Sequence, residues 1–170
     1  MKILVVSDTH GRAEPLKTVI HAVKPFDYLF HAGDVEGMED EIRREASVPC
    51  VFARGNNDYF SNLKLWEVFS AGGYRFLITH GHRMGVHGSA EALRAKAKEL
   101  RCGVAVFGHT HFPLLDESDP ELTLLNPGSL SFPRQPGREP SYAIIEIDRF
   151  GKIHYTINYL SREPKKMLWL

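Results

Sequence analysis

Side chains that can bind a metal ion recur at five places in the sequence, each directly after an apolar run. In the last of these, FGHTH at residues 107–111, His109 and His111 flank one threonine. The main donors of the five segments are two carboxylates, one amide and four imidazoles: Asp8, Asp34, Asn56, His10, His80, His109 and His111. Such a set, which has no thiolate, suits Mn, Fe, Zn, Co or Ni and disfavours Cu(I) or iron–sulfur chemistry.

Each segment by itself has an ordinary structural explanation. Gly-Asp and Asn-Asn-Asp are common turn sequences, and an isolated histidine is more often structural than a ligand. Coincidence does not readily explain the same chemistry at five strand ends, so a metal site is the favoured interpretation. Seven side chains exceed the needs of one tetrahedral ion. Two ions about 3.5–4 Å apart can share one carboxylate and clamp a phosphoryl group.

The apolar runs of the first half predict a parallel sheet. We expect strands at residues 3–6, 26–30 and 49–53 and helices at residues 13–23 and 36–46. Strands that alternate with helices in this way pair in parallel through right-handed crossovers. Ligands of open α/β sheets bind beyond the carboxyl ends of the strands, which is where the first three segments lie.

The second half begins in the same way and then changes. Strands are expected at residues 74–79 and 104–107, with a helix at 90–100 between them. Three short strands, at 122–125, 142–147 and 153–158, have no helix between them and are expected to pair antiparallel. Residues 133–140 are expected to form a long loop. We expect one domain over residues 1–170, with residues 159–170 as a C-terminal tail.

Composition limits the classes of partner. Lys plus Arg and Asp plus Glu both number 21, so no excess of basic residues points to stable nucleic-acid binding. No apolar run approaches the length of a membrane span, and the first one is too short for the core of a signal peptide. We therefore expect a cytoplasmic protein that does not associate with membranes.

The order D-x-H, G-D, G-N-x-D, H-x-H and G-H-x-H resembles that of the calcineurin-like metallophosphoesterase superfamily over residues 1–158. The small size and the sequence NPGS at residues 126–129, followed by Pro133-Arg134, are similar to its small prokaryotic branch of YfcE-type phosphodiesterases. The resemblance implies an α/β fold, a two-sheet αββα sandwich with mixed sheets.

The resemblance also implies how two divalent ions would be held. Asp34 would bridge them; one ion would be bound by Asp8, His10 and His111, and the other by Asn56, His80 and His109. Mn is expected, with Fe, Zn, Ni or Co as alternatives. In an extended segment residues i and i+2 point the same way, so both rings of residues 109–111 could face one cluster, and Gly108 would allow the sharp turn before them.

Residues beside the ligands are candidates for further roles. His82, placed by the same alternation, is expected to contact substrate or a metal-bound water. His31 could support Asp34 or simply pack, and Arg134 could bind a phosphate oxygen or remain solvated. Asn57 stands where many members of the superfamily have a general-acid histidine, and an amide cannot act as an acid. Candidate catalytic residues are therefore Asp34, His82 and Asn57, while His21, His87 and His154 receive no role.

The expected function is a metal-dependent phosphodiesterase that hydrolyses small nucleotide-type phosphodiesters by attack of a metal-bridging hydroxide. One alternative is a phosphomonoesterase or protein phosphatase of the same superfamily. Another is a non-catalytic scaffold similar to the retromer subunit of this fold, whose metal site is degraded. All seven ligand positions are filled here, which favours catalysis.

The C-terminal tail suggests a homo-oligomer. The chain ends in Met167-Leu168-Trp169-Leu170 after a charged run at residues 162–166. An apolar tail of this kind either folds back on its own core or buries itself against a second copy.

Overall fold

The computed structural model describes residues 1–160. They contain two five-stranded mixed sheets. The first sheet has the order β10-β9-β1-β2-β3, with the strands Ile153–Tyr159, Ser141–Ile147, Lys2–Val6, Tyr28–His31 and Cys50–Phe52. The second has the order β4-β5-β6-β8-β7, with the strands Trp66–Ala71, Tyr74–Thr79, Val104–Val106, Leu122–Pro127 and Pro113–Asp119.

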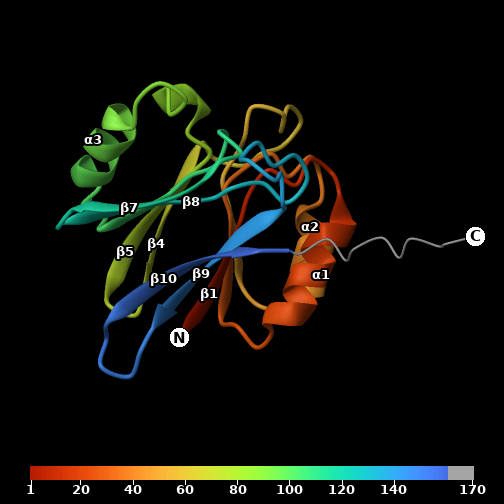
Figure 1. Ribbon diagram of the computed structural model, residues 1–170, viewed down its shortest axis with the longest axis horizontal. Coiled ribbons are helices and arrows are strands. Elements are labelled where there is room, and N and C mark those ends of the chain that lie inside the picture. Colours follow the sequence, from red (N-terminus) through yellow and green to blue (C-terminus); the bar gives the residue numbers. More distant parts are fainter. Residues whose placement is uncertain (161–170) are drawn as a thin grey trace, which may run out of the picture.

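Helices cover the outer face of each sheet (Figure 1). The helices α1 (Ala13–Val23) and α2 (Glu39–Ala46) pack against the first sheet, and α3 (Glu91–Glu99) packs against the second. A short 3-10 helix, η1 (His82–Met84), follows β5. The buried face of α1 has the spacing of an amphipathic helix and consists of Leu16, Val19, Ile20 and Val23. The four layers confirm the expected αββα sandwich.

The main core lies between the two sheets. Phe30 of β2 and Phe76 of β5 are fully buried there, with ring centroids 5.5 Å apart in an edge-to-face arrangement. Alternate residues of a strand point to opposite faces, so Ile3 and Val5 face this core while the residues between and after them face the α1 and α2 layer. Burial on both faces fixes β1 inside the sandwich.

The parallel strands bring their carboxyl ends to one edge of the molecule, the upper edge in Figure 1. β1, β2 and β3 run parallel in the first sheet, and β5, β6 and β8 run parallel in the second. The five segments with potential metal ligands follow β1, β2, β3, β5 and β6. Both sheets therefore contribute to the same edge.

The strand pairing of the second half differs from the prediction. β9 and β10 pair antiparallel as expected, but β8 is not part of that set: it lies parallel to β6 and antiparallel to β7 in the other sheet. β9 instead pairs antiparallel with β1. The prediction was wrong because residues 128–140, which contain no helix or strand, carry the chain from one sheet to the other.

The apolar pattern predicts neither β4 nor β7, which form the two edges of the second sheet. β7 reads PLLDESD and is largely polar, as is common for edge strands. β4 contains no fully buried residue. The start of α2 also differs, at Glu39 instead of residue 36, because left-handed φ angles at Gly33, Asp34, Glu36 and Gly37 prevent a helix there.

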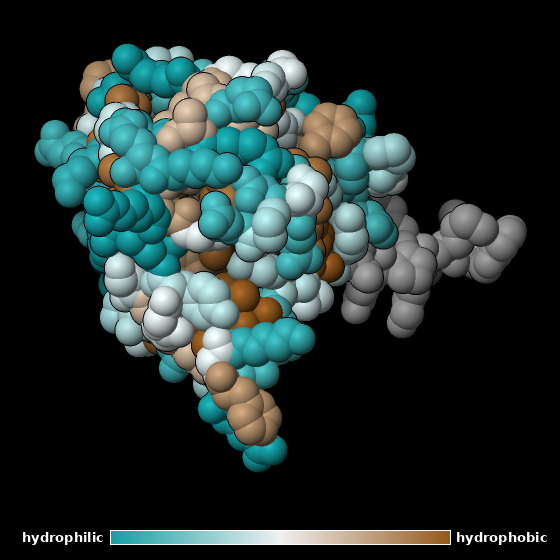
Figure 2. Space-filling view, turned by 90° about the vertical axis from the view of Figure 1, so that its left-hand side faces the viewer, coloured by the Kyte–Doolittle hydropathy of each residue, from teal (hydrophilic) through white to brown (hydrophobic). Residues whose placement is uncertain are grey.

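The side of the molecule in Figure 2 is mostly hydrophilic, with apolar residues exposed near the middle of the view and at separate places toward its top and bottom. No helix within residues 1–160 is long and apolar enough to cross a membrane. The tail that we expected from residue 159 overlaps β10, which ends at Tyr159. Its apolar end, residues 167–170, lies outside the described residues, and so does the self-association predicted from it.

Candidate metal centre

The backbone is left-handed at five of the seven predicted ligands. The φ angles are 54° at Asp8, 47° at His10, 55° at Asp34, 68° at His109 and 61° at His111. The expected extended conformation of residues 109–111 is therefore wrong. Such angles cost a non-glycine residue about 1–3 kcal/mol and occur mainly at functional sites, where the surrounding structure enforces them. Here the amides of Asp8 and His10 each donate a 3.0 Å hydrogen bond to the loop after β2.

Two glycines allow the backbone to pass directly against the carboxylates. A Cβ atom at Gly55 would overlap Oδ1 of Asp34, and one at Gly108 would overlap Ser7 Oγ and lie 2.8 Å from Oδ2 of Asp8. Any larger residue would displace a predicted ligand. The need for glycine at position 108 thus comes from close packing, not from the turn that we expected.

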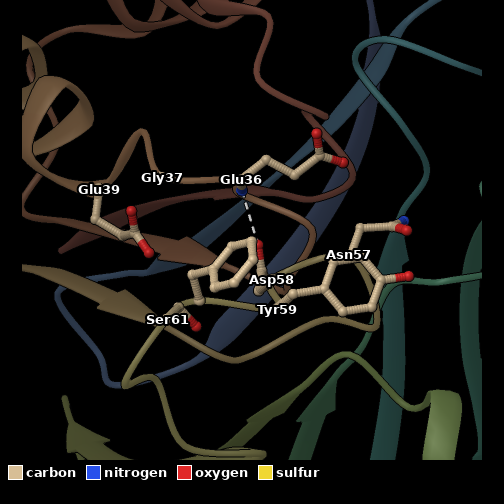
Figure 3. Close-up of a pocket in the computed structure, with 8 residues that line it drawn as sticks. Glu36, Gly37, Glu39, Asn57, Asp58, Tyr59 and Ser61 are labelled. Atoms are coloured by element: carbon tan, nitrogen blue, oxygen red, sulfur yellow. Dashed lines mark hydrogen bonds between the residues drawn. The ribbon is translucent and has the colours of Figure 1, made fainter.

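Asp58 is a buried carboxylate that shapes the loop carrying Asp34. Its oxygens accept hydrogen bonds of 2.7–3.0 Å from four backbone N–H groups, those of Asp34, Val35, Glu36 and Gly55. Figure 3 shows the bond from Glu36. Bonds to an ionised acceptor are stronger than neutral ones, so Asp58 holds the loops after β2 and β3 together. We gave Asp58 no role from the sequence, although its place in the G-N-x-D pattern was a usable signal.

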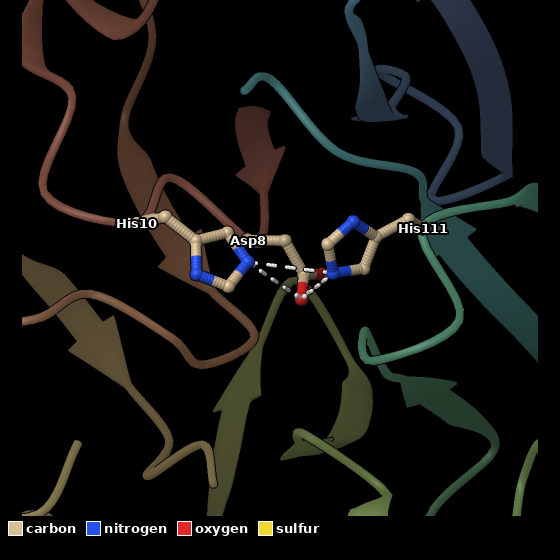
Figure 4. A group of neighbouring side chains, drawn as sticks. All are labelled: Asp8, His10 and His111. Carbon is tan, nitrogen blue, oxygen red and sulfur yellow. Dashed lines mark hydrogen bonds and ion pairs between the residues drawn. The ribbon is translucent and has the colours of Figure 1, made fainter. Parts of the chain in front are cut away.

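Asp8, His10 and His111 form the first group of potential ligands (Figure 4). Oδ1 of Asp8 lies 3.1 Å from Nε2 of His111 and 4.0 Å from Nε2 of His10, and the two Nε2 atoms are 3.4 Å apart. This buried Oδ1 has no hydrogen-bond partner within residues 1–160. A buried charged oxygen is costly unless it is paired, so its position between two imidazole nitrogens fits a bound cation.

Asp34 lies between this group and a second one. Its Oδ2 is 3.8 Å from Nε2 of His10 and 3.4 Å from Nε2 of His80. Nε2 of His80 in turn lies 3.1 Å from Oδ1 of Asn56, and the ring of His109 packs edge-on against that of His80 with centroids 5.0 Å apart. Oδ1 of Asp8 also comes within 3.9 Å of His80. The seven predicted ligands are thus brought together, while their division between two ions stays a prediction.

Three of the imidazoles are oriented through their Nδ1 atoms. His80 donates from Nδ1 to Ala32 O and His111 donates to Phe132 O, both at 2.7 Å. A carbonyl can only accept, so in a neutral ring the lone pair lies on Nε2. Nδ1 of His10 lies 2.8 Å from Oε1 of Glu36, an arrangement that raises the basicity of a metal-binding histidine. In all three rings Nε2 faces the carboxylates.

The charges of the cluster favour ionised carboxylates. Burial alone would raise the pKa of Asp8, but contacts with His111 and His80 hold that pKa below its ordinary value. Burial would also raise the pKa of Asp34, but hydrogen bonds from His80 and Asn57 outweigh burial and lower this pKa. Burial would lower the pKa of His80, but Asp34 and Asp8 raise it. Without a cation, a proton on His80 therefore stabilises the cluster and competes with metal binding.

The pKa of His109 is shifted in the direction opposite to that of His80. Burial, followed by the neighbouring His80 and His87, lowers its pKa to about 4. Its ring is therefore neutral at physiological pH, which is the form that binds a metal.

Asn57 contacts Asp34 with both of its donors. Its backbone N–H bonds Oδ1 at 2.8 Å and its side-chain amide bonds Oδ2 at 2.7 Å. These bonds orient the carboxylate, so the geometry makes Asn57 a positioning residue for Asp34.

His82 and His31 lie differently from the sequence expectation. His82 begins η1, so strand alternation does not place it, but its ring still lies 5.4 Å from that of His80 and 6.1 Å from that of His109. His31 does not touch the Asp34 side chain. Its Nε2 lies 3.0 Å from Thr9 Oγ1, which donates a 3.3 Å bond to the backbone carbonyl of Asp34. Burial lowers the pKa of His31 to about 4.

A cavity of about 330 Å³ opens over the cluster. Arg134 lines it, together with His87, Asn57 and Phe132. The ring of His87 lies 4.5 Å from that of His109, although we assigned His87 no role from the sequence. It lies in the loop before α3, away from the strand ends on which our reasoning relied, so no sequence signal marked it.

The NPGS segment supports the cluster from behind. Asn126 donates from Nδ2 to Gly108 O at 2.9 Å and to Thr110 Oγ1 at 3.0 Å. Ser129 Oγ donates to Asp8 O at 2.8 Å. This segment thereby fixes the loops that carry Asp8, His109 and His111.

Comparison with known proteins identifies the family of this chain. Residues 1–149 match the model of the calcineurin-like phosphoesterase superfamily domain. The chain is 34% identical over 150 residues to the probable metallophosphoesterase YsnB of Bacillus subtilis, covering 87% of this chain and 85% of the relative.

Solved structures show the same similarity. A predicted phosphoesterase from Streptococcus pneumoniae has a TM-score of 0.76 and 31% identity, covering 86% of this chain and 83% of the other. Vps29 from Entamoeba histolytica, complexed with Zn²⁺, has a TM-score of 0.73 and covers 94% of this chain and 99% of the other. At 22% identity, that likeness shows the fold alone. The family model and the bacterial relatives together establish that this chain belongs to the calcineurin-like metallophosphoesterase superfamily.

Proposed function

We propose that the chain is a phosphodiesterase that hydrolyses small phosphodiesters with the aid of two divalent metal ions. One observation carries this proposal: three Nε2 atoms converge on the carboxylates of Asp8 and Asp34, and Asp8 Oδ1 has no hydrogen-bond partner among the described residues. Carboxylate oxygens and neutral imidazoles are the ligands expected for Mn, Fe, Zn, Co or Ni.

The two metal ions and the phosphate would be held by different residues. Asp8, His10 and His111 would hold one ion, Asn56, His80 and His109 the other, and Asp34 would contact both. When bound, the ions supply Lewis-acid charge that neutralises phosphoryl oxygens and acidifies water. Glu36 and Asn57 keep His10 and Asp34 in position, while Arg134 and His87 line the cavity where a phosphate would lie.

One feature favours a diester over a monoester. A second cavity beside the first leaves room for another ester arm. Mn is our expectation among the metals.

The scaffold alternative makes a different prediction. The fold is shared with Vps29, so architecture does not discriminate between catalysis and assembly. The complete set of ligands favours catalysis, because a scaffold has no need to hold five strained residues around an unpaired carboxylate oxygen.

Chelator-treated protein, reloaded with Mn²⁺, Zn²⁺ or Co²⁺, tests the proposal. We expect about two ions per chain by elemental analysis and faster hydrolysis of bis(4-nitrophenyl) phosphate than of 4-nitrophenyl phosphate. Preference for the monoester would support the phosphatase alternative. Tight metal binding without turnover of either ester would support the scaffold.

A further inference from the structure

Two aromatic side chains next to the metal centre are exposed to an unusual degree. Tyr59 is 74% exposed, and Phe60 is fully exposed at 103%. They are neighbours in the loop after β3 and line a cavity of about 350 Å³. Apolar surface gathered at the mouth of a cavity marks a binding site more often than chance exposure does.

This second cavity borders the cavity over the metal centre. Asn57 lines both cavities, and its amide holds the carboxylate of Asp34. Glu36, which also lines the second cavity, contacts His10. In Figure 3 the ring of Tyr59 lies next to Asn57, and the carboxylate of Glu39 turns inward from the opposite side. A molecule bound in one cavity can therefore extend into the other.

The lining defines the chemistry of the occupant. Tyr59 and Phe60 offer faces on which a planar ring can stack, while Glu36, Glu39, Asn57 and Ser61 supply polar groups. Among the described residues, no Lys or Arg lines this cavity. Three carboxylates line the cavity; Asp58 is occupied by four backbone N–H groups, and Glu36 and Glu39, with no Lys or Arg in the lining, repel a second phosphate group. The occupant is thus planar, aromatic and free of additional negative charge.

We infer that this cavity binds the nucleoside arm of the phosphodiester, with its base stacked on Tyr59 and Phe60. The inference rests on the proposed function, because the phosphate of the same molecule must lie over the metal centre. Stacking on aromatic side chains tolerates any base, since every base has a π face. The cavity therefore selects a nucleoside over a simple alkyl arm, and an unphosphorylated nucleoside over one that carries another phosphate.

Two substrates with one leaving group provide the test. Thymidine 5′-(4-nitrophenyl phosphate) and methyl 4-nitrophenyl phosphate both release 4-nitrophenol when water adds to phosphorus and the aryl P–O bond breaks. Their kcat/KM ratio therefore reports the contribution of the second arm and not the acidity of the leaving group. We expect this ratio to be roughly 5- to 150-fold in favour of thymidine in the Mn²⁺-loaded wild type.

The variant Tyr59→Ala/Phe60→Ala should bring this ratio close to one. Phe150→Ala, which removes an 80% exposed ring on the β9–β10 turn, is the matched control and should leave both rates as in the wild type. A 3′-phosphate on the thymidine arm should lower kcat/KM in the wild type, and Glu39→Gln should recover part of that loss.

An unchanged kcat/KM ratio in Tyr59→Ala/Phe60→Ala would overturn the inference. If both substrates lost activity equally, so that the ratio stayed the same, the aromatic residues would stack on the nitrophenyl group instead. Equal rates for both substrates in the wild type would overturn it while leaving the proposed function intact. Hydrolysis of neither substrate with any of the three metals would refute the proposed function and this inference with it.

Discussion

The two sheets contribute different chemistry to the same edge of the molecule. The loops after β1, β2 and β3 supply all the oxygen donors, namely Asp8, Asp34 and Asn56, whereas the loops after β5 and β6 supply imidazoles alone. The oxygen side is fixed by N–H groups that donate to Asp58 and by the amide of Asn57. The imidazoles of His80 and His111 are fixed by carbonyls that accept from Nδ1. N–H donors therefore position the carboxylates, and carbonyl acceptors turn Nε2 of His80 and His111 toward them.

The largest effect is expected on the oxygen side, at the carboxylate that faces both groups. Asp34→Asn should abolish most activity and lower the affinity for both ions. The loss of affinity should be well over the 10–100-fold that is typical of residues that only support a ligand. Asp8→Asn should mainly lower the affinity for one of the two ions. Metal stoichiometry and titration on the two variants measure this. Two tightly bound ions and near-normal turnover in Asp34→Asn would rule out a shared ligand. Equal loss of both ions in Asp8→Asn would mean that the ligands are divided differently between the ions or that the two sites are strongly coupled.

The support of the oxygen side should matter for stability as well. Asp58→Asn replaces an acceptor of four backbone N–H bonds with an amide whose NH₂ group faces some of them. We expect a loss of about 2–4 kcal/mol in the free energy of unfolding, measured by urea denaturation. Asp40→Asn, which removes an exposed carboxylate from α2, is the matched control. Equal stability of the two variants would contradict the role given to Asp58.

His31 should make the metal-free protein sensitive to acid. Its pKa is lowered by burial to about 4 from an ordinary 6.5, so the folded state binds a proton less readily than the unfolded state. The stability from this residue is complete above pH 6.5 and is lost as the pH falls toward 4, by about 3 kcal/mol in total. Urea denaturation of chelated wild type and His31→Gln over this range measures it. Parallel pH profiles would show that His31 is not responsible.

Asn57 tests whether orientation or proton transfer matters at its position. Asn57→Ala should reduce metal affinity about 10–100-fold, because Asp34 Oδ2 loses the bond from the side-chain amide and keeps only the backbone N–H bond to Oδ1. With no acid here, wild-type kcat/KM should fall steeply as the leaving-group pKa rises, since general acid catalysis is typically worth about 10²–10⁴-fold. A flat dependence in both wild type and His82→Ala would mean that another group supplies the proton.

The smallest effect is expected at the rim of the cavity. Arg134→Ala should raise KM about tenfold with little change in metal affinity, because a single partly exposed contact to phosphate is typically worth about 1–2 kcal/mol. Arg138→Ala, in the same loop but outside the residues that line the metal cavity, serves as the control. A change in metal content without a change in KM would remove Arg134 from the substrate site.

The family resemblance implied the αββα class, and the apolar pattern predicted the elements that end at the metal centre, because buried parallel strands are continuous apolar runs that stop where polar ligands begin. It did not predict β4 and β7, since edge strands lack that pattern. The positions of the ligands could be predicted but not their backbone conformations, because hydrogen bonds between distant loops enforce the left-handed angles. Glu36 and His87 were missed for the same reason, because their roles depend on contacts across the fold, whereas Asp58 was missed although the G-N-x-D pattern marked it.

The bonds from the NPGS region to the loop after β1 also determine when the centre can form. Ser129 Oγ reaches Asp8 O across 121 residues of sequence, and Ser131 Oγ reaches Thr9 O across 122. Contacts between such distant residues close late in folding and slow it. During synthesis, a chain that ends before residue 129 contains all seven predicted ligands but lacks the two hydroxyl groups that hold the backbone at Asp8 and Thr9. The loop that carries Asp8 therefore reaches its fully bonded form only in a chain that extends through residue 131.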